Sequence, residues 1–217
     1  PGGSDATHPG RSTRLFKKLS SQQVDAFTTL SRHIKTATPT AIWNALILAV
    51  IARHKEHGVA VLGQPFSGRH GRENQQIIGC FANVLPIAIK VDLQAGFDVL
   101  VGTVAREILS MLDVQDYPLS RLIKDLSQTA KAPVDLPFDA VSTIEINEDI
   151  DDINDIDFGA GKFPLMVTLL KCGAGTFIAI EYKTSIYGPQ WAERFAERLL
   201  SFLGSLAIEP DKPLGQI

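Results

Sequence analysis

The sequence lacks the features that mark several easily recognised functional classes. It has only two cysteines among 217 residues, Cys80 and Cys172, and neither has a partner at metal-ligand spacing. Both stand in apolar surroundings, which predicts buried free thiols in a cytoplasmic protein. The longest apolar run, Ala41–Ala52, is interrupted at Trp43-Asn44 and is too short to cross a bilayer. We therefore expect no membrane association.

The charge balance is also not that of a protein that binds nucleic acid. The net charge of −3 argues against attraction of the whole chain to a polyanion. With 45% apolar and 21% charged residues, the composition is typical of one globular domain. Residues 1–12 are rich in Gly, Ser, Pro and Thr and have no signal-peptide core, so we expect a flexible linker there and the domain at 13–217. The start at Pro1 fits either removal of an initiator Met or a cut from a longer polypeptide.

Hydrophobic periodicity predicts alternating helices and strands. Ser20-x-x-Gln23 has the form of a capping box, and Thr38-Pro39 is a second helix start. Gly173-Ala174-Gly175 between two alternating runs predicts a hairpin. We expect helices at about 20–34, 38–57, 98–112, 118–126 and 188–206, and strands at 13–19, 59–62, 84–91, 139–146, 163–170 and 176–183. This order predicts an α/β fold in which helices pack on a mixed β-sheet.

Residues 64–89 carry the candidate site. Gly68, Gly71 and Gly79 allow positive φ angles and close backbone approach, and Arg69 stands among them in a basic loop. Apolar runs on both sides predict that the loop joins two buried strands. A polar loop held between strands is a common way for a fold to present a binding or tunnel-lining segment.

Two carboxamides stand out because their surroundings are apolar or tightly turned. Asn83 precedes Val84-Leu85-Pro86, and burying its amide without partners would cost about 1–3 kcal/mol. It must therefore either hold a backbone turn or face a polar ligand. Gln115, just before Asp116-Tyr117-Pro118, poses the same alternative at a helix junction.

No catalytic or metal-binding set is evident among the titratable residues. His54-x-x-His57 could hold a metal on a helix, but no third ligand follows at a sensible spacing, and cationic residues favour a helix C-terminus. The acidic run at 148–157 lacks the glycine and closing glutamate of a calcium loop, which favours a solvated loop. We predict no nucleophile, no general base and no metal site.

Several segments together resemble one protein family. Ile78–Pro86, IGCFANVLP, resembles the "IGxFxNxLP" core motif of nonribosomal peptide synthetase condensation domains. Gln64–Arg69 is similar to the family's "G-x-P-x-x-G-R" lead-in, with Gly63 one place early. Gln115–Pro118 is similar to its "HQDYPF" motif, and the resemblance extends in order over residues 13–217.

The chain also departs from the family pattern. Val114 and Leu119 replace the histidine and phenylalanine that flank the QDYP segment, and Ala88 replaces an arginine. The "RDxSRNPLF" motif survives only in Asp135–Phe138. Pro164 replaces an aspartate and predicts an edge or bulged strand position. These changes leave the subtype open between amide-forming, ester-forming, epimerising and cyclising relatives.

The resemblance implies a chloramphenicol-acetyltransferase-like lobe, which is half of a V-shaped domain with a tunnel between its lobes. Carrier proteins bring the acyl or peptidyl thioester and the amine to that tunnel on phosphopantetheine arms, and no cofactor is bound directly. Amide formation depends on an "HHxxxDG" motif in the first lobe, and this sequence has no His-His pair. The resemblance therefore implies a C-terminal lobe without catalytic residues, inactive alone, whose tunnel-side or structural residues are Arg69, Gly79, Asn83, Pro86, Gln115, Asp116 and Pro118.

Two other functions stay open at this point. The first is a non-catalytic module that binds a carrier protein or a partner lobe. The second is a one-lobe trimeric acetyltransferase, which would need His-x-x-x-Asp-Gly near its C-terminus, although the last third of this chain has no histidine. An isolated lobe should leave apolar surface uncovered, so we also expect modest stability or self-association.

Overall fold

The structure is a computed structural model that describes residues 11–34, 37–69, 76–79, 81–147 and 161–217. In this part of the chain, six strands form one sheet and five α-helices accompany it. The strands are β1 (Ser12–Lys18), β2 (Val59–Phe66), β3 (Asn83–Lys90), β4 (Ala140–Asn147), β5 (Leu165–Cys172) and β6 (Gly175–Lys183). The helices are α1 (Ser21–His33), α2 (Pro39–Ala52), α3 (Phe97–Met111), α4 (Leu119–Ala130) and α5 (Pro189–Ile208), with short 3₁₀ turns η2 (Leu112–Val114) and η3 (Leu214–Gln216).

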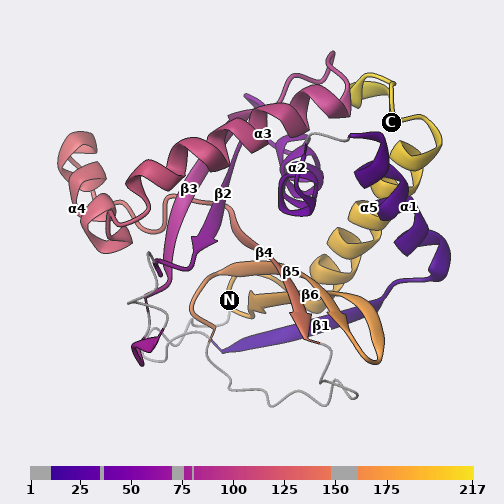
Figure 1. Cartoon of the computed structure of the whole chain (residues 1–217). Helices are drawn as coiled ribbons and strands as arrows, with labels where there is room; N and C mark the ends of the chain where they lie inside the picture. Colours follow the sequence, from indigo (N-terminus) through magenta and orange to yellow (C-terminus); the bar gives the residue numbers. More distant parts are fainter. Residues whose placement is uncertain (1–10, 35–36, 70–75, 80, 148–160) are drawn as a thin grey trace, which may run out of the picture.

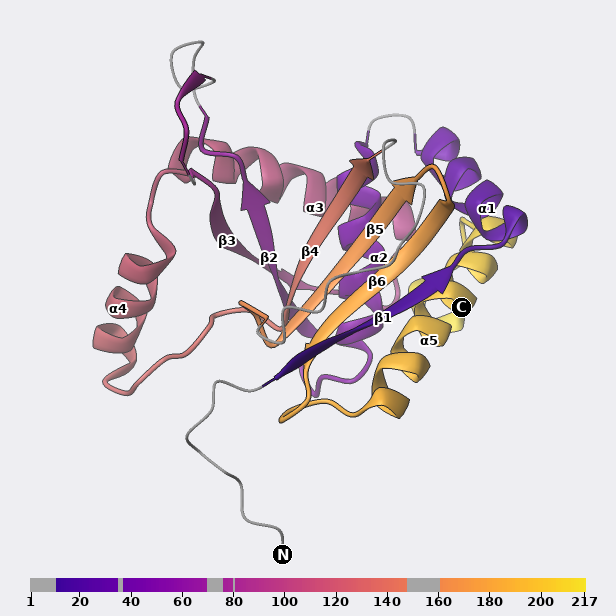
Figure 2. The ribbon, with the colours of Figure 1, turned by 90° about the horizontal axis from the view of Figure 1, so that it is seen from below.

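The sheet is mixed, which confirms the predicted fold class. Its strand order is β1-β6-β5-β4-β2-β3, with β4 parallel to both β2 and β5 and the remaining neighbours antiparallel. Helices α1, α2, α3 and α5 gather on one face of the sheet, whereas α4 stands apart beyond the edge strand β3 (Figures 1 and 2). Among the described helices, none combines the length and apolar character that a bilayer crossing requires.

Helix α2 forms the centre of the main hydrophobic core. It begins as predicted, with the Thr38 hydroxyl accepting a hydrogen bond from the Ala41 amide at 3.2 Å and Pro39 in the first turn. It is apolar on all sides and almost wholly buried, as expected of a helix between layers. The helix ends at Ala52, not near His57 as predicted, because charged residues follow Ala52 and a helix enclosed on all sides cannot bury them.

Three other predictions about the strands need correction. Strand β1 includes Ser12, which pairs with Lys183 although we placed it in the linker. Strand β2 continues to Phe66, because its antiparallel pairing with β3 extends over all eight of its residues. Pro164 is neither an edge nor a bulge residue: it precedes the central strand β5, where its missing N–H interrupts no ladder bond, and its carbonyl accepts from the Lys183 amide at 3.0 Å.

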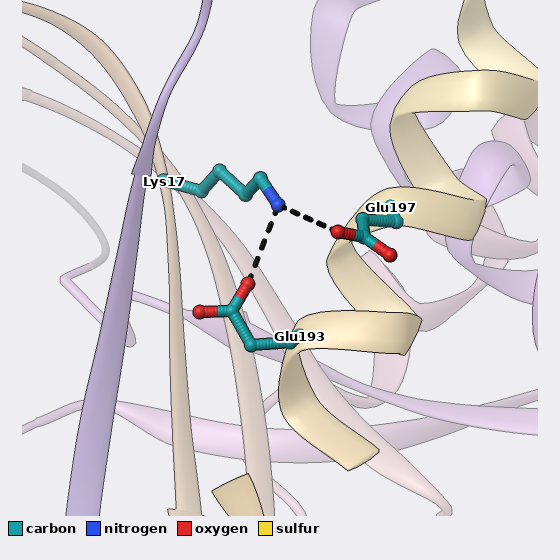
Figure 3. Close-up of polar contacts among 3 residues, drawn as sticks. All are labelled: Lys17, Glu193 and Glu197. Carbon is teal, nitrogen blue, oxygen red and sulfur yellow. Dashed lines mark hydrogen bonds and ion pairs between the residues drawn. The ribbon is translucent and has the colours of Figure 1, made fainter. Parts of the chain in front are cut away.

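The edge strand β1 is fastened to helix α5 by charge. The Lys17 ammonium lies 3.3 Å from a carboxylate oxygen of Glu193 and 3.2 Å from one of Glu197, one helical turn further on (Figure 3). Burial acts to lower the pKa of Lys17, but hydrogen bonds to Glu197 and Glu193 outweigh this, and the pKa is raised. The ammonium therefore stays charged, although an exposed ion pair of this kind contributes less than about 1 kcal/mol to the stability of the fold.

The sheet divides between β2 and β4, and a buried polar network spans the division. These strands pair only at Leu62 with Ala140 and at Gly63 with Val141, and then diverge (Figure 2). The fully buried Asn44 of α2 donates to the Gln64 side-chain oxygen at 2.6 Å. Its own oxygen accepts a hydrogen bond from the buried Ser142 hydroxyl at 2.7 Å. One amide thus connects the helix to both diverging strands.

Replacing Asn44 by alanine should destabilise the fold by about 3 kcal/mol, because Gln64 and Ser142 would each keep a buried polar atom without its partner. Urea unfolding measures the loss. Ser31→Ala is the control, since it also removes a side-chain hydrogen bond, from Ser31 to the Phe27 carbonyl, but on the part-buried surface of α1. It should change stability by less than about 0.5 kcal/mol. Equal effects of the two substitutions would contradict a central role for the network.

Candidate functional site

Six of the seven predicted site residues meet where β2 ends, β3 begins and α4 starts. We call this region the β3–α4 corner and define it as Phe66–Arg69, Gly79–Asn83 without Cys80, and Gln115–Leu119. The corner lies at the edge of the sheet from which α4 extends (Figure 1). The seventh residue, Pro86, lies further along β3, opposite Gly63. Because β3 is an edge strand, a proline is tolerated there.

Asn83 holds the backbone of the corner together. Its amide nitrogen donates to the carbonyl oxygens of Gln115 at 2.9 Å and Tyr117 at 2.7 Å. Its side-chain oxygen accepts from the Leu119 amide, the first of α4, at 3.2 Å. Of the two roles that the sequence left open, holding a backbone turn is therefore the one observed. The first residue of β3 thus fixes the start of a helix 36 residues later in the chain.

Apolar packing supports the same junction. Leu119 packs against a small cluster of Val84, Val141 and Phe163, which is separate from the main core. Pro118 precedes α4 with extended backbone angles, and its carbonyl accepts from the amides of the first helical turn. The Gln115 side chain donates to the Leu112 carbonyl at 2.7 Å and so also serves a local turn, while Asp116 is exposed.

Arg69 anchors the loop between β2 and β3. Its guanidinium donates to the carbonyl oxygens of Ile77 and Gly79, both at 2.9 Å, and lies 4.8 Å from the centre of the Phe81 ring. The Arg69 side chain therefore connects the residues that precede and follow the segment 70–75. Gly71, for which we predicted a similar conformational freedom, lies outside the described residues.

The glycines of the loop have different roles. Gly68 adopts a φ of +62°, and a Cβ there would lie only 2.2 Å from the Phe81 carbonyl oxygen, so the position requires glycine. Gly79 does not have a positive φ, and the expectation that it supplies one was wrong. A Cβ at Gly79 would instead meet the Phe81 ring at 3.3 Å. The close packing of this ring, not a left-handed turn, is what limits the side chain at that position.

Sequence reasoning missed a polar group on the outer side of the corner. The Tyr117 hydroxyl donates a hydrogen bond to the Asp125 carboxylate on α4, and Arg121 lies 5.6 Å from the Tyr117 ring centre. The hydrogen bond to Asp125 raises the pKa of the phenol, so Tyr117 keeps its proton near neutral pH. Arg121 is four residues from both Tyr117 and Asp125, and this spacing was a signal that could have revealed its contacts with them.

The corner contains amides, a guanidinium and backbone groups, and these can orient and hydrogen-bond a substrate. No three His, Cys, Asp or Glu side chains in the described part of the chain are grouped as a metal site would require. His54 and His57 do not share a helix, since α2 ends before both. Cys172 is buried as predicted, whereas Cys80 and the acidic run at 148–157 lie outside the described residues.

Comparison with known proteins identifies the class to which this fold and corner belong. The profile of the condensation domain family matches residues 6–217, which is nearly the whole sequence. The chain therefore belongs to the condensation domain family. Its six-stranded sheet and helices are the chloramphenicol-acetyltransferase-like arrangement of that family.

Individual relatives are large synthases of which the chain matches a small part. It is 27% identical over 164 residues to surfactin synthase subunit 1 of Bacillus subtilis (strain 168), covering 72% of this chain and 5% of that protein. It is 26% identical over 181 residues to bacitracin synthase 1 of Bacillus licheniformis, covering 78% of this chain and 3% of that protein.

A solved structure shows how much of a condensation domain the chain represents. The first condensation domain of the CDA synthetase superposes with a TM-score of 0.78 at 19% sequence identity. The match covers 99% of this chain but only 49% of that chain. The chain thus spans about half the length of a solved condensation domain.

Replacing Asn83 tests the corner directly. Asn83→Ala should destabilise the protein by about 1–2 kcal/mol and speed hydrogen exchange of the Leu119 amide, because three hydrogen bonds are lost. Asn83→Asp keeps the acceptor for Leu119 but places a carboxylate against two carbonyl oxygens, so it should cost at least as much. Urea unfolding and amide exchange measure both effects. Parent-like stability of Asn83→Asp would show that the donor side of the amide is not needed.

Gly68→Ala should destabilise the protein by about 1–3 kcal/mol, because alanine is strained at positive φ and its methyl group would collide with backbone. The matched control is Gly102→Ala in α3, where a Cβ meets nothing within 4 Å. That substitution should stabilise the helix by up to about 1 kcal/mol. Thermal unfolding of the two variants compares them, and a neutral Gly68→Ala would rule out the strained turn.

Proposed function

We propose that this chain is the C-terminal half of a condensation domain and forms one wall of its reaction tunnel. In that tunnel a carrier-bound acyl or peptidyl thioester is transferred to a carrier-bound amine. The observation that carries the proposal is the match to 99% of this chain but 49% of a solved condensation domain. The absence of any His-His pair from the sequence supports assignment to the half without the HHxxxDG motif.

The proposed reaction replaces one bond at the carbonyl carbon by another. The amine nitrogen attacks the thioester carbonyl carbon, the C–N bond forms, and the C–S bond breaks. The nitrogen loses a proton and the phosphopantetheine thiol is released with one. We assign proton transfer to the half that carries the HHxxxDG motif, so the half formed by this chain positions the substrates.

The corner suits a positioning role because its backbone is held by side chains. The Asn83 side chain hydrogen-bonds two carbonyls and one amide of the corner, and the Arg69 guanidinium hydrogen-bonds the carbonyls of Ile77 and Gly79. A wall held in this way loses little conformational entropy when a substrate binds against it. Alignment of the two reactants can supply a large part of the rate enhancement in such a tunnel.

Exposed apolar surface near the corner supports the proposal that a partner lobe packs there. At the end of α3 and in η2, Leu109, Leu112 and Val114 are 63%, 44% and 50% exposed. Helix α4 carries a strongly one-sided apolar stripe, Leu119, Leu122, Ile123 and Leu126, of which no residue is fully buried. Neighbouring apolar groups of this kind usually mark an interaction surface. The same surface would support the second candidate, a module that binds a carrier protein or a partner lobe without chemistry.

An assay with two loaded carrier proteins separates the candidates. The chain alone should give no amide product above the buffer background, measured by mass spectrometry of the acceptor carrier. The chain joined to an N-terminal condensation lobe with an intact HHxxxDG motif should give product, and alanine at the second histidine of that motif should abolish it. Turnover by the chain alone would contradict the half-domain assignment. Binding of carriers by the chain, with no product from the joined lobes, would favour the interaction module.

A further inference from the structure

A cavity of about 250 Å³ opens between the end of α2 and the first half of α5, and it shares no residue with the β3–α4 corner. Three aromatic side chains of this region, Tyr187, Trp191 and Phe195, line it at helical spacing. The ring centres of Tyr187 and Trp191 are 4.2 Å apart, and those of Trp191 and Phe195 are 5.2 Å apart and nearly parallel. We call this cavity the α2–α5 pocket and define it by these three residues together with His54, Arg194 and Arg198.

The three aromatic rings form a column, which is one continuous apolar wall of the pocket. Trp191 contacts both of the other rings, with Tyr187 tilted by 33° and Phe195 nearly parallel at 13°. Aromatic rings attract one another in offset-stacked and edge-to-face arrangements. The wall therefore favours a flat aromatic ligand.

Two arginines on the same face of α5 give the pocket a positive rim. Arg194 and Arg198 are one helical turn apart, a spacing at which like charges repel. In the described part of the chain neither has a carboxylate partner. The acidic residues of the same helix, Glu193 and Glu197, are engaged by Lys17 of β1 (Figure 3). The charge of the two arginines is therefore left uncompensated.

The other polar groups of the pocket do not cancel this charge. Asp139 is paired with Lys55 at 2.5 Å, and its second oxygen accepts from the Val61 amide at 2.9 Å. The pair is neutral as a whole, which leaves the two arginines as the net charge of the pocket.

His54 holds one of the arginines in place. One of its ring nitrogens lies 2.9 Å from the Val50 carbonyl and must donate, because a carbonyl only accepts. The other lies 2.5 Å from the Arg198 guanidinium and must accept. The imidazole therefore orients the Arg198 side chain at the pocket.

Tyr187 adds a neutral donor. Burial, and then the charge of Asp139, raise the pKa of its phenol, so the hydroxyl keeps its proton. Within the described residues this hydroxyl makes no hydrogen bond, which leaves it available to a ligand. A second hollow of about 360 Å³ continues from the pocket past Arg198 and adds the hydroxyls of Ser201 and Ser205, giving room for a polar extension.

We propose that the α2–α5 pocket binds a small aromatic anion, with its carboxylate or phosphate between Arg194 and Arg198 and its ring against the aromatic column. Charge-assisted hydrogen bonds to the guanidinium groups would hold the anion, and the aromatic wall would select a flat body. This proposal does not depend on the proposed function, because it uses no residue of the corner.

Calorimetric titration of the whole chain with 2-naphthoate tests the proposal. We expect saturable binding that also changes the fluorescence of Trp191, and the uncharged 2-naphthamide should bind about tenfold more weakly or worse. Arg194→Gln and Arg198→Gln should each weaken naphthoate binding by about tenfold. Arg32→Gln, an exposed arginine on α1, is the matched control and should bind like the parent. A parallel titration with 1-naphthyl phosphate distinguishes a phosphate site from a carboxylate site.

Three results would overturn the proposal. The first is equal binding of naphthoate and naphthamide, which would mean that the arginines do not recognise the charge. The second is parent-like binding by the Arg194→Gln/Arg198→Gln double variant, provided that its melting temperature matches that of the parent. The third is no binding of either aromatic anion at millimolar concentration.

Discussion

The structure depends most on the interactions that hold strands β2 and β4 in one sheet at the point where they diverge. Only two residue pairs join these strands, and at the second of them Gly63 is required, because a Cβ would lie within about 3 Å of the side chains of Val84 and Val141. Beyond that point the backbone ladder is replaced by the side chains of Gln64, Asn44 and Ser142. Their burial makes the network costly to break, since each partner left alone would be an unsatisfied polar group in the core.

This division of the sheet determines where the β3–α4 corner lies. Because β2 and β3 diverge from β4, their far ends and the loop between them leave the main core and build a smaller cluster around Val84. Asn83 and Leu119 then attach the start of α4 to that cluster, one by hydrogen bonds and the other by apolar packing. The hydrogen bonds of Asn83 thus hold the backbone of the corner at the edge of the sheet.

Two surfaces of the domain therefore have different characters. Near the corner, Leu109, Leu112 and Val114 leave apolar side chains exposed, as suits contact with a large partner. In the α2–α5 pocket, the aromatic column and the two arginines offer charge and shape on the scale of a small molecule. The two surfaces share no residues, so substitutions in one can be studied without directly altering contacts in the other.

The class of fold, the helix starts and the family could all be predicted from the amino-acid sequence. Local signals sufficed for these: the Ser20 capping box, the Thr38-Pro39 start, the hairpin glycines and the ordered motifs from Gly63 to Pro118. It also identified Asn83 as an amide that must be satisfied, but not its partners, which are 32 to 36 residues away. The tertiary structure shows that these partners are backbone groups of the segment that leads into α4. The same holds for the network around Asn44 and for the α2–α5 pocket. Both arise from side chains on separate elements, and no local pattern encodes how far apart packed elements lie.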